Sequence, residues 1–260
     1  MQGAAKAHLA HRQRRGTRRP LPQHPDAMPE PRLLRTVADL LMPRTCPGCG
    51  AVLAYGERDV CCLCLADLPL LTPGLWATDR RWGLFRELPH VRSIGALVRY
   101  HPGNVASRLV HSLKYHGRWQ VGVVMGCLMS RLLGGKGLLE GADVVLPVPI
   151  TWRRRWQRGF NQSEFIARGL CQTTGIAMRT DLLLRTRHTE SQTHFPYAER
   201  AGRVEGSFSL APGAALQLRG RTVVVLDDVM TSGSTMRAAA MALAAAECAA
   251  VRCVAWSWAG

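Results

Sequence analysis

The sequence lacks the features of a membrane or secreted protein. No apolar stretch reaches the length of about 18 residues that a membrane-spanning helix requires. The N-terminus is basic but has no apolar segment of the kind found in secretory signals. These absences predict a cytoplasmic protein with no membrane insertion.

Two common nucleotide-binding patterns are also missing. The chain has neither G-x-x-x-x-G-K-[ST] nor G-x-G-x-x-G, which argues against a P-loop NTPase and a Rossmann dinucleotide enzyme. Acidic residues are scarce as well, since 18 Asp and Glu face 34 Lys and Arg for a net charge of +16. A genome rich in G+C favours arginine codons and explains part of this excess. A surface of this charge attracts polyanions such as nucleic acids and phosphorylated ligands.

Composition and periodicity divide the chain into four parts. Residues 1–30 are rich in Arg, His, Gln and Pro and are expected to form a disordered basic extension. Residues 31–68 are expected to hold a helix and a four-cysteine zinc finger, and residues 69–90 a linker or covering segment. Residues 91–260 alternate apolar strands with helices, which predicts an α/β domain with a doubly wound, mostly parallel sheet. The expected strands are 91–100, 143–148, 222–226 and 251–258, and the expected helices are 104–116, 119–133, 161–174 and 234–246.

A small-residue loop follows the third expected strand. It places hydroxyls and free backbone N–H groups at the start of a helix, which suits a phosphate dianion. The loop residues are Thr231, Ser232, Gly233, Ser234 and Thr235. Asp227 and Asp228 precede the loop; they would repel a phosphate but suit the hydroxyls of a ribose. The segment therefore predicts a sugar-phosphate site, the alternative being two acids that merely cap a helix.

A second segment is basic and aromatic. Four arginines suited to a bidentate grip on pyrophosphate lie between a strand and a helix, at Arg153, Arg154, Arg155 and Arg158. Trp152, Trp156 and Phe160 lie among them and are suited to stacking on the bases of a single strand. The alternative is a solvated basic loop whose aromatic side chains pack on the core.

The cysteines near the N-terminus have the spacing of a metal site. Cys46, Cys49, Cys61 and Cys64 form C-x₂-C-x₁₁-C-x₂-C, and four thiolates make a closed, structural zinc site. In a cytosolic protein this spacing favours metal over disulfides. A ligand set that includes Cys62 is the alternative, but it breaks the C-x-x-C spacing.

Taken together, these motifs resemble the ComF family, which includes ComFC and GntX. The resemblance covers roughly residues 33–258. It is carried by the 224–235 segment, Leu113-Lys114-Tyr115-His116-Gly117, Pro147-Val148-Pro149, Arg158-Gly159-Phe160-Asn161-Gln162, Arg185-x-Arg187-x-Thr189-x-x-Gln192, Glu199-Arg200 and Phe208. Two departures are Ser232, where the family usually has Thr, and Arg203, where it usually has Asn.

The resemblance implies a type I phosphoribosyltransferase fold and a site for phosphoribosyl pyrophosphate (PRPP). Asp227 and Asp228 would bind the ribose hydroxyls, and Thr231 to Thr235 the 5′-phosphate. The basic residues named above, with Gly159, Phe160 and Asn161, would form a pyrophosphate or nucleic-acid loop, and Arg185, Arg187, Gln192 and Arg200 a hood over the ligand.

The resemblance also implies a role and partners. The role is support of natural transformation by DNA uptake, with single-stranded DNA and a competence helicase as partners. The alternatives are an active Mg²⁺-dependent phosphoribosyltransferase of unknown acceptor and a regulator that senses PRPP. The implied metals are structural zinc, and Mg²⁺ with PRPP if the protein is active.

Overall fold

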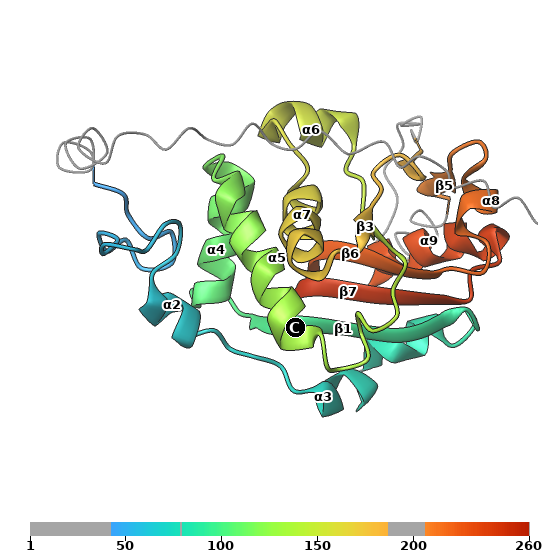
Figure 1. Ribbon diagram of the computed structural model, residues 1–260, viewed down its shortest axis with the longest axis horizontal. Helices are drawn as coiled ribbons and strands as arrows, with labels where there is room; N and C mark the ends of the chain where they lie inside the picture. The colour runs from blue at the N-terminus through green and yellow to red at the C-terminus, as the bar shows by residue number, and fades with distance from the viewer. Residues whose placement is uncertain (1–42, 79, 187–205, 260) are drawn as a thin grey trace, which may run out of the picture. The chain divides into compact units, whose positions relative to one another are not determined.

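The computed structural model describes residues 43–78, 80–186 and 206–259 (Figure 1). The expected extension over residues 1–30 and the hood residues Arg187, Gln192 and Arg200 lie outside the described residues. From Arg44 onward the chain forms one compact unit. Within the described ranges, no helix is both long enough and apolar enough to cross a membrane.

A parallel sheet of five strands forms the centre of this unit, and it confirms the predicted fold class. The strand order is β1-β7-β6-β2-β3, and every neighbouring pair is parallel. The strands are β1 (Val91–Tyr100), β2 (Val144–Pro147), β3 (Ala177–Met178), β6 (Thr222–Met230) and β7 (Ala250–Ala259). All four residues of β2 are buried, as expected for a strand covered on both faces.

Helices pack on this sheet where the periodicity predicts them (Figure 1). They are α4 (Val105–Tyr115), α5 (Trp119–Leu133), α7 (Gln162–Thr174) and α9 (Ser234–Ala242), which continues as the 3₁₀ helix η3 (Leu243–Ala246). Asn104 and Asn161 cap α4 and α7, each accepting a hydrogen bond from a backbone N–H of the first turn. Helices α5 and α7 lie side by side, in contact through glycines at positions 126 and 169.

The segment between the cysteine module and the sheet is more regular than expected. It contains α3 (Pro73–Thr78) and the 3₁₀ helix η1 (Arg80–Phe85). Trp76 and Phe85 are buried, so this segment packs on the domain instead of crossing solvent. These short helices were not predicted, because the prolines of this segment indicated irregular structure.

Three further elements differ from the sequence-based expectation. The basic segment expected as a loop forms α6 (Trp152–Arg158), capped by Thr151. Strand β6 continues past the acidic pair, because Val229 and Met230 pair with β7. A short antiparallel pair, β4 (Leu183–Arg185) with β5 (Phe208–Leu210), was not expected. The remaining short helices are α2 (Cys62–Ala66) and α8 (Ala214–Leu218).

Candidate functional site

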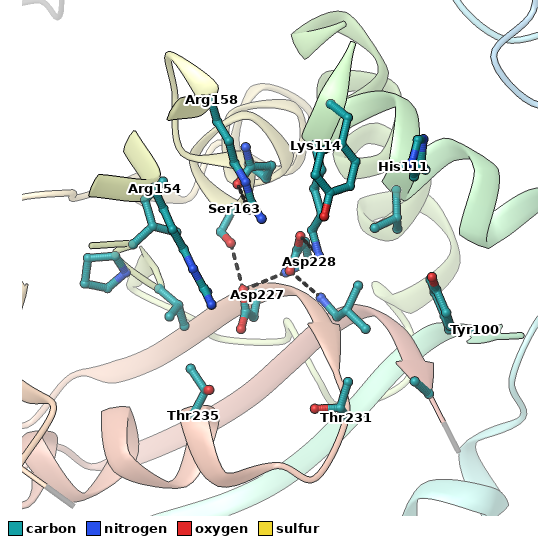
Figure 2. A pocket seen from close by; sticks show the side chains of 18 of the residues that line it. Tyr100, His111, Lys114, Arg154, Arg158, Ser163, Asp227, Asp228, Thr231 and Thr235 are labelled. Carbon is teal, nitrogen blue, oxygen red and sulfur yellow. Dashed lines mark hydrogen bonds and ion pairs between the residues drawn. The ribbon is translucent and has the colours of Figure 1, made fainter. Parts of the chain in front are cut away.

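A cavity of about 600 Å³ lies at the carboxyl end of β6, where parallel sheets bind ligands (Figure 2). Among its lining residues are Tyr100, His111, Lys114, Tyr115, Arg154, Arg158, Gln162, Ser163, Arg185, Asp227, Asp228, Thr231 and Thr235. These residues come from β1, α4, α6, α7, β4, β6, the loop after β6, and α9. The fold therefore gathers into one place groups that are far apart in the sequence.

The two carboxylates of β6 lie side by side on the cavity wall (Figure 2). Asp228 is 8% exposed, and its Oδ2 lies 2.8 Å from Nζ of Lys114. Asp227 accepts a hydrogen bond of 2.9 Å from the hydroxyl of Ser163 and one of 2.8 Å from the backbone N–H of Asp228. The charge of Asp228 is therefore balanced by the ammonium group of Lys114, whereas Asp227 accepts hydrogen bonds from uncharged donors.

The surroundings of Asp227 shift the pKa of its carboxyl group. Burial, and then the negative charge of Asp228, raise the pKa of Asp227 to about 7. The hydrogen bonds from Asp228 and Ser163, and the charge of Lys114, act in the opposite direction. Near neutral pH the Asp227 carboxyl is therefore only partly ionised.

Three of the predicted basic residues face the carboxylates. Arg154 and Arg158 lie four residues apart on α6, hence on one face of the helix, and both line the cavity. Arg158 donates a hydrogen bond of 2.9 Å to Gln162. Burial and the nearby charge of Arg154 lower the pKa of Arg185, the third of these residues. The cavity wall opposite β6 is therefore strongly positive.

The other residues predicted around α6 lie off the cavity lining. Arg153 is exposed, and Arg155 pairs with Glu164 at 3.0 Å. Gly159 ends α6 with a φ of 78°, a conformation that favours glycine. Asn161 is buried, caps α7 and donates to the carbonyl of Val148. These last two residues build the turn between α6 and α7.

The aromatic side chains of this segment divide into two kinds. Trp152 and Trp156 are 63% and 83% exposed. Phe160 is half-buried and packs edge-on against Phe165, with ring centroids 5.1 Å apart. The two tryptophans are therefore the residues of this set that remain open to a stacking partner.

The small-residue loop follows β6 and leads into α9. Thr231 and Thr235 line the cavity, whereas Ser232, Gly233 and Ser234 are not among its lining residues. The hydroxyls of Ser232 and Ser234 lie 2.9 Å apart, and Gly233 has a φ of 85°. The loop thus presents its first and last threonines to the cavity.

Sequence reasoning missed several lining residues. Lys114 and Tyr115 lie in a segment that contributed to the family resemblance but received no role. Tyr100 and His111 belonged to no motif, and Ser163 lay in the helix expected over residues 161–174 without a predicted role. These five residues share no sequence pattern. What they share is their place in the fold, because all line the cavity at the carboxyl end of the parallel sheet.

The four predicted cysteine ligands come together in a separate cluster. The sulfur atoms of Cys46, Cys49, Cys61 and Cys64 all lie within 4.8 Å of one another. Such a cluster can bind a metal such as zinc, for which four thiolates are a common ligand set. Burial would raise the pKa of Cys46, but backbone N–H groups, chiefly those of Cys61 and Gly48, lower it to about 7, whereas burial raises the pKa of Cys64.

Two arginines join the cysteine module to the helices beside the cavity. Arg108 of α4 donates to the carbonyl of Gly48. Arg118, which precedes α5, donates a hydrogen bond of 2.8 Å to the carbonyl of Thr45. Hydrogen bonds from these two arginines therefore connect the cysteine module to α4 and to the start of α5.

Comparison with known proteins defines the class of the chain. Residues 183–256 match the model of the phosphoribosyl transferase domain. Two solved structures are similar over 52% of this chain and 26% of theirs, at 24% identity. They are an allosteric regulatory enzyme of purine biosynthesis (TM-score 0.36) and the glutamine PRPP amidotransferase of B. subtilis (TM-score 0.35). Together with the parallel sheet, the domain match defines a protein with a phosphoribosyltransferase fold.

Sequence relatives define the family. The DNA utilization protein YhgH of Escherichia coli K12 is 30% identical over 208 residues, which are 76% of this chain and 89% of YhgH. YhgH of Salmonella typhimurium is 33% identical over 136 residues, about half of this chain and 57% of that protein. Competence protein F of Haemophilus influenzae is 31% identical over 98 residues, 38% of this chain and 42% of that protein. The chain belongs to the ComF family.

Proposed function

We propose that this protein binds PRPP or a related sugar phosphate in the cavity at the carboxyl end of β6. The observation that carries the proposal is the meeting of a carboxylate pair, two loop threonines and three arginines in one cavity. Its volume of about 600 Å³ falls in the usual range for small-molecule sites.

Each group has a role in this proposal. Asp227 and Asp228 accept hydrogen bonds from the ribose hydroxyls, which requires Lys114 to leave Asp228. The hydroxyls and N–H groups from Thr231 to Thr235 bind the 5′-phosphate. The arginines of the opposite wall bind pyrophosphate, together with Mg²⁺.

We further propose that the basic surface beside the cavity binds single-stranded DNA and that the protein supports DNA uptake. The net charge of +16 and the exposed Trp152 and Trp156 among the α6 arginines support the binding. The names of the relatives, a DNA utilization protein and a competence protein, support the role.

Calorimetric titration with PRPP and Mg²⁺ tests the sugar-phosphate proposal. Asp228→Asn is expected to weaken PRPP binding at least about tenfold, since a ribose hydroxyl loses a charged acceptor. Asp181→Asn is the matched control, because Asp181 is exposed and pairs with Arg179 outside the cavity. Equal PRPP affinity of Asp228→Asn and the wild type would overturn the proposed site.

Fluorescence anisotropy with a labelled single strand tests the DNA proposal. Binding is expected to weaken steeply as salt rises, because phosphate contacts release counterions. No binding at low salt would remove the DNA proposal and leave the sugar-phosphate proposal standing.

Phosphoribosyl transfer is the second candidate, and the arginines across the cavity from the carboxylates favour it, since they suit a departing pyrophosphate. A nucleophile would form a bond to C1 of the ribose as the bond from C1 to pyrophosphate breaks. Mg²⁺-dependent release of pyrophosphate with a nucleobase or nucleic-acid acceptor would establish transfer. No release with any acceptor would identify a binding protein or a sensor of PRPP.

A further inference from the structure

A second cavity, of about 360 Å³, lies between the cysteine module and α4. The module contributes Thr45, Cys46 and Pro47, and the helices and the turn after α4 contribute Arg108, His111, Ser112, His116 and Arg118. Within the described ranges, this lining contains two arginines and two histidines and no acidic residue. Its chemistry is that of an anion site.

Hydrogen bonds to uncharged groups hold the two arginine side chains of this cavity in place, and these bonds leave their positive charge uncompensated. Arg108 donates to the carbonyls of Gly48 and Gly103, and Arg118 donates to the backbone and hydroxyl oxygens of Thr45. These partners carry no net charge, and each arginine uses two of its five N–H donors on them. Among the residues that the structure describes, neither guanidinium forms an ion pair.

The second cavity adjoins the first. His111 of α4 lines both, and Tyr115, one turn further along the helix, lines the first. Tyr115 is 63% exposed, and its ring lies 4.7 Å from that of His111 and 5.7 Å from the guanidinium of Arg158. A flat, exposed ring thus contacts both His111, which lines the two cavities, and Arg158 of the first cavity.

We propose that the second cavity binds a phosphodiester group of single-stranded nucleic acid, while the Tyr115 ring stacks on an adjacent base. The strand then passes from the cysteine module, over the end of α4, toward the first cavity. Alternating cations and exposed rings suit a polynucleotide, because phosphates and bases alternate at short intervals along it. The inference rests on the proposed DNA binding and assigns it a location.

The test uses His116→Glu in the full-length, zinc-loaded protein. His116 is exposed, and none of its described side-chain contacts is to the cysteine module, so the substitution places a carboxylate in the cavity without disturbing the fold. The dissociation constant for a labelled single strand is expected to rise about tenfold at about 0.1 M salt. PRPP affinity and zinc content are expected to stay unchanged.

Arg131→Gln is the matched control, since it changes the charge by the same amount at the far end of α5. Arg131 is exposed and lies about 18 Å along the helix from Trp119. Strand binding by this variant is expected to fall less than twofold. Equal losses in both variants would show an effect of net charge and overturn the proposed location.

Tyr115→Leu is the second variant, and it removes the ring without changing charge. It is expected to weaken strand binding at least about fivefold. Titration with inorganic phosphate distinguishes a strand from a small anion, because the strand is expected to bind at least about tenfold more tightly. Equal affinity for phosphate and strand would overturn the proposal.

The outcomes separate the two claims. If the wild type binds no strand, the proposed DNA binding fails. If the wild type binds a strand and both His116→Glu and Tyr115→Leu bind it equally well, the location fails and the DNA binding stands.

Discussion

Asp227 and Asp228 are neighbours in the sequence, but the fold gives them different electrostatic surroundings. Lys114 lies 2.8 Å from Asp228, whereas Asp227 has a hydroxyl and a backbone N–H as partners. The pair was predicted from the sequence, because two acids before a small-residue loop have few other uses. The partner Lys114 was not predicted, because it lies more than a hundred residues earlier in the chain.

Replacement of Asp227 by Asn is expected to stabilise the protein at pH 8. The folded pKa of Asp227 is raised to about 7 from an ordinary value of 3.8. Between these two pKa values the folded state keeps a proton that the unfolded state releases, so this contribution to stability is lost as pH rises from about 4 to about 7 and then changes no further. Asp227→Asn is expected to raise the free energy of unfolding at pH 8 by about 1–3 kcal/mol.

Urea unfolding at pH 5, 6, 7 and 8 measures this effect. The variant is expected to show a flatter decline of stability with pH than the wild type, and weaker PRPP binding. Asp181→Asn is the control of opposite sign, because hydrogen bonding to Arg179 lowers the pKa of Asp181. A variant Asp227→Asn less stable than the wild type at pH 8 would contradict the raised pKa.

Gly48 lies against the four-cysteine cluster, and the geometry of the cluster depends on its lack of a side chain. A Cβ at this position would stand 2.6 Å from the sulfur of Cys64, closer than real contacts allow. Gly48→Ala is therefore expected to lower zinc affinity at least about tenfold, because a ligand must move. Competition with a chromogenic chelator measures this affinity. Gly135→Ala, where a Cβ meets open space, is expected to match the wild type.

At the scale of elements, the buried strands were predictable and α6 was not. Strand β2 and the first half of β6 are buried, nearly continuous apolar runs, and β7 is mostly apolar, with Arg252 and Ser257 as its polar residues. Helix α6 has no buried residue, so it carries no apolar period, and its arginines suggested a loop. Its remaining signals were the cap Thr151 and the terminal Gly159. Strands β4 and β5 have three residues each, too few for a pattern.

The contact between α5 and α7 depends on glycine. A Cβ at Gly126 would stand 1.9 Å from the carbonyl oxygen of Ile166, and one at Gly169 would stand 2.0 Å from that of Val123. Because these obstacles are backbone atoms, a helix must move. Gly126→Ala is expected to lower the free energy of unfolding by about 3 kcal/mol, measured by urea unfolding. A loss no larger than that of Gly135→Ala would contradict the close packing.

At the scale of the whole molecule, the sequence predicted some of the residues that line the cavity but not how they meet. The acidic pair, the loop and the arginines were each predicted from a local pattern. Which arginines line the cavity follows from the face of α6 that is turned toward β6, and the second cavity follows from the position of the cysteine module on α4. Neither arrangement can be predicted from a local sequence pattern, because both depend on contacts between segments that are distant in the sequence.

A metal bound by the four cysteines would stabilise the whole unit. The cysteine module belongs to the same compact unit as the sheet and is fastened by Arg108 and Arg118. Chelation is therefore expected to lower the melting temperature of the single transition by at least about 5 °C, measured by scanning calorimetry. Added zinc is expected to restore it. A separate transition for the module, with the main one unmoved, would show that the module is independent.

The position of β7 in the sheet has a consequence for how the protein is made. The neighbour of β1 in the five-stranded sheet, within the described ranges, is β7, which begins 150 residues after β1 ends. At a translation rate of about 5–20 residues per second, roughly 8–30 s pass between the synthesis of β1 and that of its partner. During that interval the edge of β1 that pairs with β7 is open to wrong contacts, whereas its other edge can pair with residues 69–71. Synthesis of this chain is therefore expected to depend on protection of the nascent β1, by a chaperone or by the cysteine module that emerges before it.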